Sequence, residues 1–422
     1  MTTFYIRSLG CKVSQYDGER IAEKLKEYGL EEQEECPDVF ILNGCSVTGR
    51  ASQKARQLIR AVKRKKNDSK IVLAGCEARL VKKHNETVPE VDWLLPYSDI
   101  DSINEMMSAL SLDIKCDNTE SATKIQHTGM TRAYLKVQDG CSQFCSYCIV
   151  AHLRGPEWSR PIDDAIKEAK ELIDEGHKEI VLTGIHVGHY KPSLVPLLKE
   201  LEKLDGLERI RLSSIESVEV KDELIDWVAN SPKACHHFHL PLQSGCDKIL
   251  KAMHRPYLTK DFKAVVEHIR ESMPEAAITT DLIVGFPGET EEDFQETLNF
   301  LDEIQFSRFH IFRYSKRDGT PAAVMPNQIS NEIKIARSDR VEKVWKKYAN
   351  NFAKHFEGHK VEVLWETLED GWLKGYSKEY VPCKLKSDDT SLKNKLMTVT
   401  GIKAEENELI VEKNYNLSLH FS

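Results

Sequence analysis

Six of the eleven cysteines in this 422-residue chain stand in patterns that could hold metal. Three of them, Cys141, Cys145 and Cys148, follow an apolar run with the spacing Cys-x3-Cys-x2-Cys. Three thiolates on one short loop can hold three corners of a [4Fe-4S] cluster and leave the fourth iron without a protein ligand. A zinc site more often shows two Cys-x2-Cys pairs, although His152 keeps a Cys3His site open. The pattern therefore favours an iron–sulfur cluster with an open iron.

Cys11, Cys45 and Cys76 share a second pattern, in which an apolar run ends, a glycine follows and the cysteine comes next. If the apolar runs are parallel strands, all three thiols emerge at the carboxyl edge of one sheet, where open α/β folds place ligands. Buried structural cysteines are the alternative explanation. Three converging thiols again predict a cluster with one free iron, here a candidate site for holding an extra sulfur atom. The cysteines that share neither pattern, and that we expect to be structural, are Cys36, Cys116, Cys235, Cys246 and Cys383.

Residues 1–112 alternate short apolar runs with amphipathic stretches, which predicts a parallel, doubly wound sheet. The helix predicted at 51–66 carries an apolar stripe at i, i+3, i+4 spacing. A polar stretch at 111–129 has the composition of a linker. The predicted strands lie at 4–9, 38–43 and 70–74, and the predicted helices at 21–29 and 51–66.

From residue 129 to 357 the alternation continues at a longer spacing and predicts six β/α units. A complete eightfold barrel would need about 250 residues, so we expect a partial (β/α)6 barrel. The cysteine loop at 141–148 follows the first strand, and α/β barrels carry their chemistry at the carboxyl ends of strands. The predicted strands lie at 133–138, 179–184, 209–214, 236–241, 277–285 and 307–314, and a long closing helix is predicted at 329–356.

Residues 358–422 change to short alternating runs separated by turn residues, which predicts a small all-β domain. The fold class is therefore α/β, with an N-terminal sheet domain (1–112), a central partial barrel (129–357) and a C-terminal β-barrel (358–422).

The composition is that of a folded protein, with 41% hydrophobic and 30% charged residues. A net charge of -8 gives no general attraction for nucleic acid or for an anionic membrane. No apolar run approaches about 18 residues, and the first residues show no signal peptide. We expect a soluble, cytoplasmic protein without a membrane partner, whose thiols are reduced and free to bind metal.

The loop at 141–148, with Tyr147 just before the last cysteine, resembles the cluster loop of radical S-adenosylmethionine (SAM) enzymes. The resemblance implies that the open iron binds SAM through its amino and carboxylate groups. An electron from the reduced cluster then cleaves SAM to a 5′-deoxyadenosyl radical. Four further motifs end strands at the same rim, at 183–188, 211–217, 239–245 and 281–290. The SAM contacts implied by the resemblance are Tyr147, Gly184, Ser213, Glu216 and Gln243.

Taken alone, the motif Gly-Phe-Pro-Gly-Glu-Thr at 285–290 has a simpler explanation. Thr290 is a good N-cap residue, and the acidic residues at 291–293 suit a helix N-terminus. This motif therefore supports the resemblance only as one member of an ordered set.

The whole layout resembles the methylthiotransferases, which combine a three-cysteine domain, a radical SAM barrel and a C-terminal TRAM domain. These enzymes insert sulfur at an unactivated C–H bond and methylate it, with one SAM as methyl donor and one as radical source. The resemblance implies two [4Fe-4S] clusters, a tRNA substrate and an electron donor such as flavodoxin or ferredoxin. The implied ligands are Cys11, Cys45 and Cys76 for the auxiliary cluster, and Cys141, Cys145 and Cys148 for the SAM cluster.

Within this family, the runs at 10–19, 135–150 and 312–322 look most like the branch that acts on tRNA N6-threonylcarbamoyladenosine. The implied reaction adds a methylthio group to C2 of that nucleoside next to the anticodon. Alternative substrates are N6-isopentenyladenosine in tRNA and an aspartate of a ribosomal protein. A different class of protein, a non-catalytic RNA-binding protein with structural zinc, is the further alternative.

Some positions depart from the family pattern, and three of them surround the predicted auxiliary cluster. Ser14 stands where the family usually has Asn, Gly44 where it has Thr or Ser, and Arg79 where it has Gln. Ala151 and Arg313 occupy usual proline positions. No predicted cluster ligand is missing, so the departures concern the surroundings of the auxiliary site.

Electrostatics alone do not predict RNA binding. Basic residues on the helix at 51–66 could follow phosphates, but a solvated helix face explains them equally. Aromatic residues of the C-terminal domain could stack bases, although a small barrel also needs aromatics in its core. The tRNA substrate therefore rests on the resemblance. The residues concerned are Arg56, Arg60, Lys63, Arg64, Lys384, Lys386, Lys393 and Lys395, with Trp365, Trp372 and Tyr376.

Overall fold

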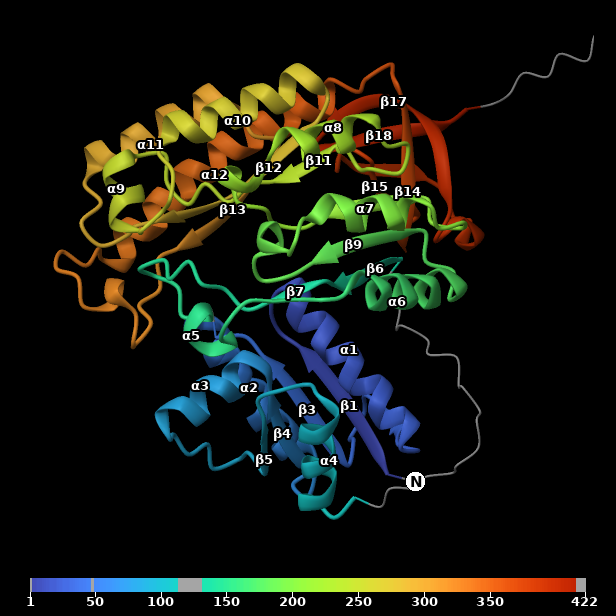
Figure 1. Cartoon of the computed structure of the whole chain (residues 1–422), viewed down its shortest axis with the longest axis vertical. Coiled ribbons are helices and arrows are strands. Elements are labelled where there is room, and N and C mark those ends of the chain that lie inside the picture. Colours follow the sequence, from blue (N-terminus) through green and yellow to red (C-terminus); the bar gives the residue numbers. More distant parts are fainter. Residues whose placement is uncertain (1, 47–48, 113–130, 415–422) are drawn as a thin grey trace, which may run out of the picture.

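The computed structural model describes residues 2–46, 49–112 and 131–414. Figure 1 shows an N-terminal sheet domain at the bottom, a central β/α region, and C-terminal strands at the upper right. Most of the predicted linker, the predicted boundary at 129 and Cys116 lie outside the described residues. Among the described residues, every helix is too short or too polar to span a lipid bilayer.

The N-terminal domain is a five-stranded parallel sheet in the order β2-β1-β3-β4-β5. Helices α1 and α4 cover one face, and α2 and α3 cover the other, each pair with its own apolar core. The predicted doubly wound sheet is confirmed, and the chain changes face between β1 and β3. The elements are β1 (Thr3–Ser8), α1 (Lys12–Glu27), β2 (Glu31–Glu32), β3 (Val39–Gly44), α2 (Gly49–Lys65), β4 (Lys70–Ala74), α3 (Gly75–His84), β5 (Trp93–Leu95) and α4 (Ile100–Ala109).

The central region holds six parallel strands in two three-stranded sheets, β10-β9-β6 and β11-β12-β13. Parallel bridges at Ile210–Ala234 and Ser214–His239 join the two sheets. The predicted partial barrel is confirmed, and all six predicted strands are present. The strands are β6 (Arg132–Lys136), β9 (Glu179–Thr183), β10 (Arg209–Leu212), β11 (His237–His239), β12 (Ala277–Val284) and β13 (Arg308–Arg313), with a short pair of β7 (Gln138–Asp139) and β8 (Trp158–Ser159).

Helices pack around the strands of the central region and share one apolar core with them. Strands β9, β10 and β11 are buried along their whole length, as expected for parallel strands covered on both faces, whereas β6 and β13 are partly exposed. The helices are α5 (Val150–Arg154), α6 (Ile162–Asp174), α7 (Leu194–Glu202), α8 (Asp222–Asn230), α9 (Asp247–Ala252), α10 (Thr259–Ser272), α11 (Glu291–Ile304) and α12 (Asn331–Lys354).

The C-terminal domain is a closed barrel in the order β14-β15-β16-β18-β17. Strand β16 was not predicted from the sequence, because it has only five residues and begins with Pro382. Trp365 is fully buried in this barrel, so for this residue the core explanation holds and base stacking does not. The strands are β14 (Lys360–Glu369), β15 (Trp372–Ser377), β16 (Pro382–Lys386), β17 (Leu396–Glu405) and β18 (Glu408–Lys413).

Buried ion pairs fasten the C-terminal barrel to the central region. Arg211 Nε donates to Glu179 Oε1 at 2.6 Å, and Arg209 Nη2 lies 3.0 Å from Glu362 Oε1 of β14. Burial raises the pKa of Glu179, but the surrounding arginines outweigh burial and bring it to about 2. Arg211 Nη2 also donates to the carbonyl of Ser377 at 3.1 Å. The carboxylate therefore stays ionised and compensates the arginines that cross this interface.

We expect Glu179→Gln to lower the free energy of unfolding by about 3–5 kcal/mol, because it leaves buried arginines without their counter-charge. Hydrogen exchange of the β14 and β15 amides and thermal unfolding measure the effect. Glu303→Gln, which removes an exposed ion pair with Lys263, is the matched control and should change stability by less than about 0.5 kcal/mol. Equal effects of the two substitutions would contradict the assigned role of Glu179.

Candidate functional site

Cys11, Cys45 and Cys76 follow the carboxyl ends of three neighbouring strands, β1, β3 and β4. The parallel pairing of β3 with β4 continues past the sheet as a bridge between Gly44 and Gly75. Cys45 and Cys76 therefore leave the sheet side by side. The structure brings the N-terminal cysteines to one sheet edge, as the sequence pattern predicts.

Gly10 holds the first of these loops against the second. Its φ of +148° lies in a range that favours glycine, and a Cβ there would lie 3.0 Å from the Cβ of Cys45. Cys11 also lies close enough to Cys76 for their charges to interact. Burial raises the pKa of Cys11, and an ionised Cys76 raises it further, whereas Arg154 lowers it.

Local packing accounts for two of the departures from the family pattern. A Cβ at Gly44 would lie 2.7 Å from the Cβ of Glu77, so a serine or threonine does not fit there. Arg79 Nε donates to the carbonyl of Pro96 at 2.6 Å, and its guanidinium lies over the ring of Tyr97. The Arg79 charge is thus used in packing α3, the helix that begins beside Cys76.

Three polar atoms near the N-terminal cysteines are buried and, within the described part of the chain, have no hydrogen-bond partner. They are Ser14 Oγ, Ser46 Oγ and Arg154 Nε. The backbone N–H of Ser14 donates to the thiol of Cys11, and Ser46 follows Cys45 directly. Unused donors around thiols suit a group rich in sulfur acceptors, so these residues fit an iron–sulfur cluster.

Cys141, Cys145 and Cys148 lie on one loop after β7, at the carboxyl end of the first barrel strand. Burial raises the pKa of Cys148 to about 12, and the charges of Cys145 and Cys141 add to the increase. Burial also raises the pKa of Cys145. Thiols whose pKa is raised by burial gain from binding a metal, because the cations compensate the thiolates. This trio also fits an iron–sulfur cluster.

Arg255 and His186 contact this loop. Neither contact was predicted from the sequence, because both residues are distant from the loop in the sequence. Arg255 Nη1 lies 3.3 Å from Cys145 Sγ, and the same guanidinium pairs with Glu216. His186 Nδ1 lies 3.6 Å from Cys141 Sγ. Burial lowers the pKa of His186, but its contacts with Cys141 and Glu219 raise it to about 10. Two cations therefore stand beside the thiols.

The residues predicted to contact SAM all lie at the carboxyl rim of the barrel. Tyr147 lies on the cysteine loop itself, and Glu216 is joined to that loop through Arg255. Burial lowers the pKa of Arg255, but Tyr147 and Glu216 raise it. A Cβ at Gly184 would lie 2.9 Å from the carbonyl oxygen of Gln138, so glycine is needed for close approach to β7. The remaining two, Ser213 and Gln243, follow β10 and β11.

The motif at 285–290 has the simpler explanation given above. Thr290 caps α11 and forms a capping box with Asp293. Glu289 is buried and accepts hydrogen bonds from the backbone of Gly285 and from Arg337 of α12, each at 2.6 Å. The motif thus shapes a turn and fastens it to α12.

Helices α3 and α5 bring the two cysteine sites to the same boundary between domains. Cys76 and Leu80 pack against Ile149 and Leu153, the residues that follow the loop at 141–148. Figure 1 shows α5 lying against the N-terminal domain. Both cysteine trios therefore lie at this boundary, which we call the seam.

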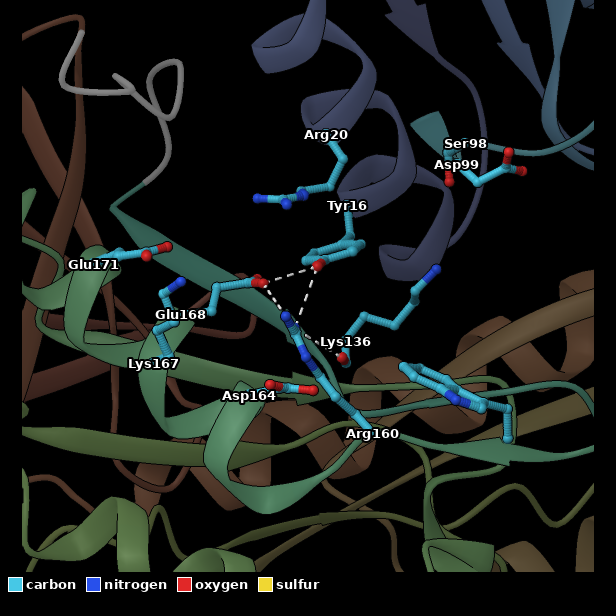
Figure 2. Close-up of a pocket in the computed structure, with 11 residues that line it drawn as sticks. Tyr16, Arg20, Ser98, Asp99, Lys136, Arg160, Asp164, Lys167, Glu168 and Glu171 are labelled. Carbon is cyan, nitrogen blue, oxygen red and sulfur yellow. Dashed lines mark hydrogen bonds and ion pairs between the residues drawn. The ribbon is translucent and has the colours of Figure 1, made fainter. Parts of the chain in front are cut away.

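A cavity of about 540 Å³ opens along the seam, lined by residues of α1, β6 and α6. Figure 2 shows Tyr16, Arg160 and Glu168 pointing toward one another across it. Arg160 Nη2 lies 2.6 Å from Glu168 Oε2, and the hydroxyl of Tyr16 donates to the same oxygen at 3.1 Å. Polar contacts thus connect the two domains beside the cysteine sites.

Two clusters of histidine and carboxylate side chains also have the spacing of a metal site. Across the described ranges, these groups of three ligand atoms within 4.8 Å of one another are Glu157–His186–His189 and His239–Asp281–His310. The histidines themselves are hydrogen-bonded, as expected for structural residues, since His239 Nε2 lies 3.1 Å from Asp281 Oδ1.

The basic helix α2 is largely neutralised within the N-terminal domain. Three of its four candidate phosphate contacts form ion pairs with acidic residues that follow α3, which supports the solvated-face explanation. In the C-terminal barrel, two lysines instead lie over the half-buried ring of Trp372. The pairs are Arg56–Glu86, Arg60–Glu90 and Lys63–Asp92, and the lysines over Trp372 are Lys384 and Lys386.

Residues 135–301 match the family described as "Radical SAM superfamily", and residues 3–95 match "Uncharacterized protein family UPF0004". The chain is 37% identical to "Threonylcarbamoyladenosine tRNA methylthiotransferase MtaB" of Bacillus subtilis, over 96% of this chain and 94% of that protein. The protein of the same name from Thermotoga maritima is also 37% identical, over 90% and 91%. A "tRNA-2-methylthio-N(6)-dimethylallyladenosine synthase" of Syntrophus aciditrophicus is 34% identical, over 94% and 88%.

Among solved structures, the radical S-adenosylmethionine methyltransferase TsrM from Kitasatospora setae has a similar fold. The TM-score is 0.57 at 14% identity, over 77% of each chain, so the likeness shows the fold alone. The match to the radical SAM superfamily implies SAM and one [4Fe-4S] cluster as cofactors.

Arg255→Met removes the cation beside Cys145 Sγ and leaves Glu216 without its partner. Both changes add negative charge around the loop at 141–148, so a cluster bound there becomes harder to reduce. We expect its midpoint potential, followed by electron paramagnetic resonance, to fall by on the order of 50 mV. Arg270→Met, which removes contacts to the carbonyls of α11 only, is the control. An unchanged midpoint in Arg255→Met would refute the assigned contact.

Proposed function

Because this chain belongs to the family of radical SAM tRNA methylthiotransferases, we propose that it adds a methylthio group to C2 of N6-threonylcarbamoyladenosine next to the anticodon of tRNA. The observation that carries the proposal is the identity of 37% to two proteins named for this activity, over at least 90% of the chain. The relatives named for dimethylallyladenosine match at 32–36%.

The division of labour follows from the two cysteine sites. Cys141, Cys145 and Cys148 would hold the cluster that binds SAM, and Cys11, Cys45 and Cys76 would hold an auxiliary cluster. When bound, these groups supply one-electron reduction of SAM and sulfur for transfer, with one SAM as methyl donor and one as radical source. The contact between α3 and α5 supports this assignment, because it holds both sites at the seam.

The chain's own residues bind and orient the reactants. Tyr147 lies on the cysteine loop, and Arg255 connects Glu216 to that loop. There the two residues would hold the adenosyl and methionyl parts of SAM. Gly184 lets the backbone after β9 approach β7 closely at the rim of the barrel. Ser213 and Gln243 would add polar contacts to SAM from the neighbouring strands. Ser213 Oγ is buried after β10 and has no hydrogen-bond partner in the part of the chain that the structure describes, which supports a polar ligand there.

Two alternatives keep the chemistry and change the substrate to N6-isopentenyladenosine or to a ribosomal protein aspartate. The non-catalytic zinc protein is not favoured, because the similar proteins are named as methylthiotransferases. An electron donor such as flavodoxin or ferredoxin and a cytoplasmic location belong to the proposal through the chemistry of the family.

Deletion of the gene in its host should abolish 2-methylthio-N6-threonylcarbamoyladenosine and leave the unmodified nucleoside to accumulate. Mass spectrometry of tRNA nucleosides measures both, and re-expression of the intact chain should restore the product. If the methylthio derivative of N6-isopentenyladenosine is lost instead, the substrate is N6-isopentenyladenosine and the proposed substrate is wrong. Unchanged nucleosides in a host without a redundant enzyme would refute the proposed substrate.

Anaerobic reconstitution should load about eight iron atoms per chain, four for each cluster. Cys76→Ala should lose about half of the iron and all sulfur insertion, but keep reductive cleavage of SAM. Cys148→Ala should lose reductive cleavage. Cys36→Ala, at an exposed cysteine outside both patterns, is the control and should keep all the iron. Stoichiometric zinc without SAM cleavage would falsify the enzyme assignment.

A further inference from the structure

Arg154, the last residue of α5, connects both domains from a buried position six residues after Cys148. Its side chain is 1% exposed. One terminal nitrogen, Nη2, donates to Asp17 Oδ2 of α1 at 2.9 Å. The other, Nη1, donates to both carboxylate oxygens of Asp139 at 3.0 and 2.9 Å. A single guanidinium thus joins the N-terminal domain to the strand that leads into the loop at 141–148.

Lys136 completes this group and balances its charge. Its Nζ lies 2.6 Å from Asp17 Oδ1 and 3.2 Å from Asp139 Oδ2, and Figure 2 shows the side chain beneath α1 at the seam. Burial raises the pKa of Asp139, but Arg154 and Lys136 outweigh burial and bring it to about 2. Both carboxylates have cationic partners, so the position of Arg154 is fixed by charge on two sides.

The same side chain lies near the N-terminal cysteines, because Leu153, the residue before it, packs against Cys76. Burial lowers the pKa of Arg154, but the nearby anions hold it well above its usual range. Among these anions an ionised Cys76 has the largest effect, ahead of Asp17 and Asp139, and Cys11 contributes as well. Arg154 Nε is buried and has no hydrogen-bond partner among the described residues. A cation with an unused donor therefore stands beside two thiols.

We propose that Arg154 stabilises the reduced state of an auxiliary cluster at Cys11, Cys45 and Cys76 through its charge and its free Nε–H, while its ion pairs fix that site relative to the loop at 141–148. This inference rests on the proposed function, because it needs the second cluster. A cluster held by thiolates gains negative charge on reduction, and its potential depends on nearby charge and on hydrogen bonds to sulfur. Arg154 supplies both in a buried, low-dielectric position.

The test uses full-length protein in which Cys141, Cys145 and Cys148 are replaced by alanine, so that only the auxiliary site can bind a cluster. Redox titration followed by electron paramagnetic resonance gives the midpoint potential. We expect Arg154→Met to shift it to more negative values and Arg154→Lys, which keeps the charge, to shift it less. Asp17→Asn removes a counter-charge and should shift it to more positive values.

An electrostatic role predicts shifts of the midpoint potential with opposite signs in Arg154→Met and Asp17→Asn. Structural damage would shift the midpoint potential of both variants in the same direction. Arg160→Met is the matched control, because Arg160 also bridges the domains, through Glu168 and Tyr16 (Figure 2). It should leave the midpoint unchanged. In protein that keeps the loop at 141–148 and lacks the N-terminal trio, Arg154→Met should have a smaller effect.

Equal midpoints for wild type and Arg154→Met, or equal shifts for Arg154→Met and Arg160→Met, would overturn the inference. If the protein with only the N-terminal trio binds no iron, the second cluster of the proposed function and this inference fall together. If the cluster is bound and the midpoint does not move, only the role of Arg154 is overturned.

Discussion

Parallel strands end at a common edge, and this constraint places every predicted ligand in the molecule. In the N-terminal sheet it gathers Cys11, Cys45 and Cys76, and in the barrel it places the loop at 141–148 on the rim. One further contact, α3 against α5, turns the two edges toward the same seam. The chemistry that the family performs needs this arrangement, because sulfur and radical must reach one carbon atom.

The departures around Cys11, Cys45 and Cys76 show how one site can tolerate changes in its surroundings. Glu77 fills the space that a larger residue at position 44 would need. Arg79 brings an extra positive charge, which is stabilised by hydrogen bonds to backbone carbonyl oxygens and by the aromatic ring of Tyr97. Ser14 is shorter than the usual Asn and leaves an unpartnered hydroxyl. The changes therefore affect hydrogen bonding around the thiols and leave the thiols in place.

Features that repeat along the chain could be predicted from the sequence, and isolated long-range contacts could not. Apolar runs followed by Gly-Cys gave the strands and the cysteine sites, because both patterns are local. Arg154 and Arg255 carry no such pattern, since their partners lie 137 and 39 residues away in sequence. For Trp365 the sequence left two explanations open, because aromatic residues of a core and of a binding face look alike in sequence, and its burial decides for the core.

The buried arginines between the central region and the C-terminal barrel have a mechanical consequence. Arg209 and Arg211 bind backbone carbonyls of β15 and the loop after it, so a swing of that barrel would break these buried hydrogen bonds. The two parts therefore move as one piece. A substrate that touched both the C-terminal barrel and the seam would therefore have to match a constant distance between them.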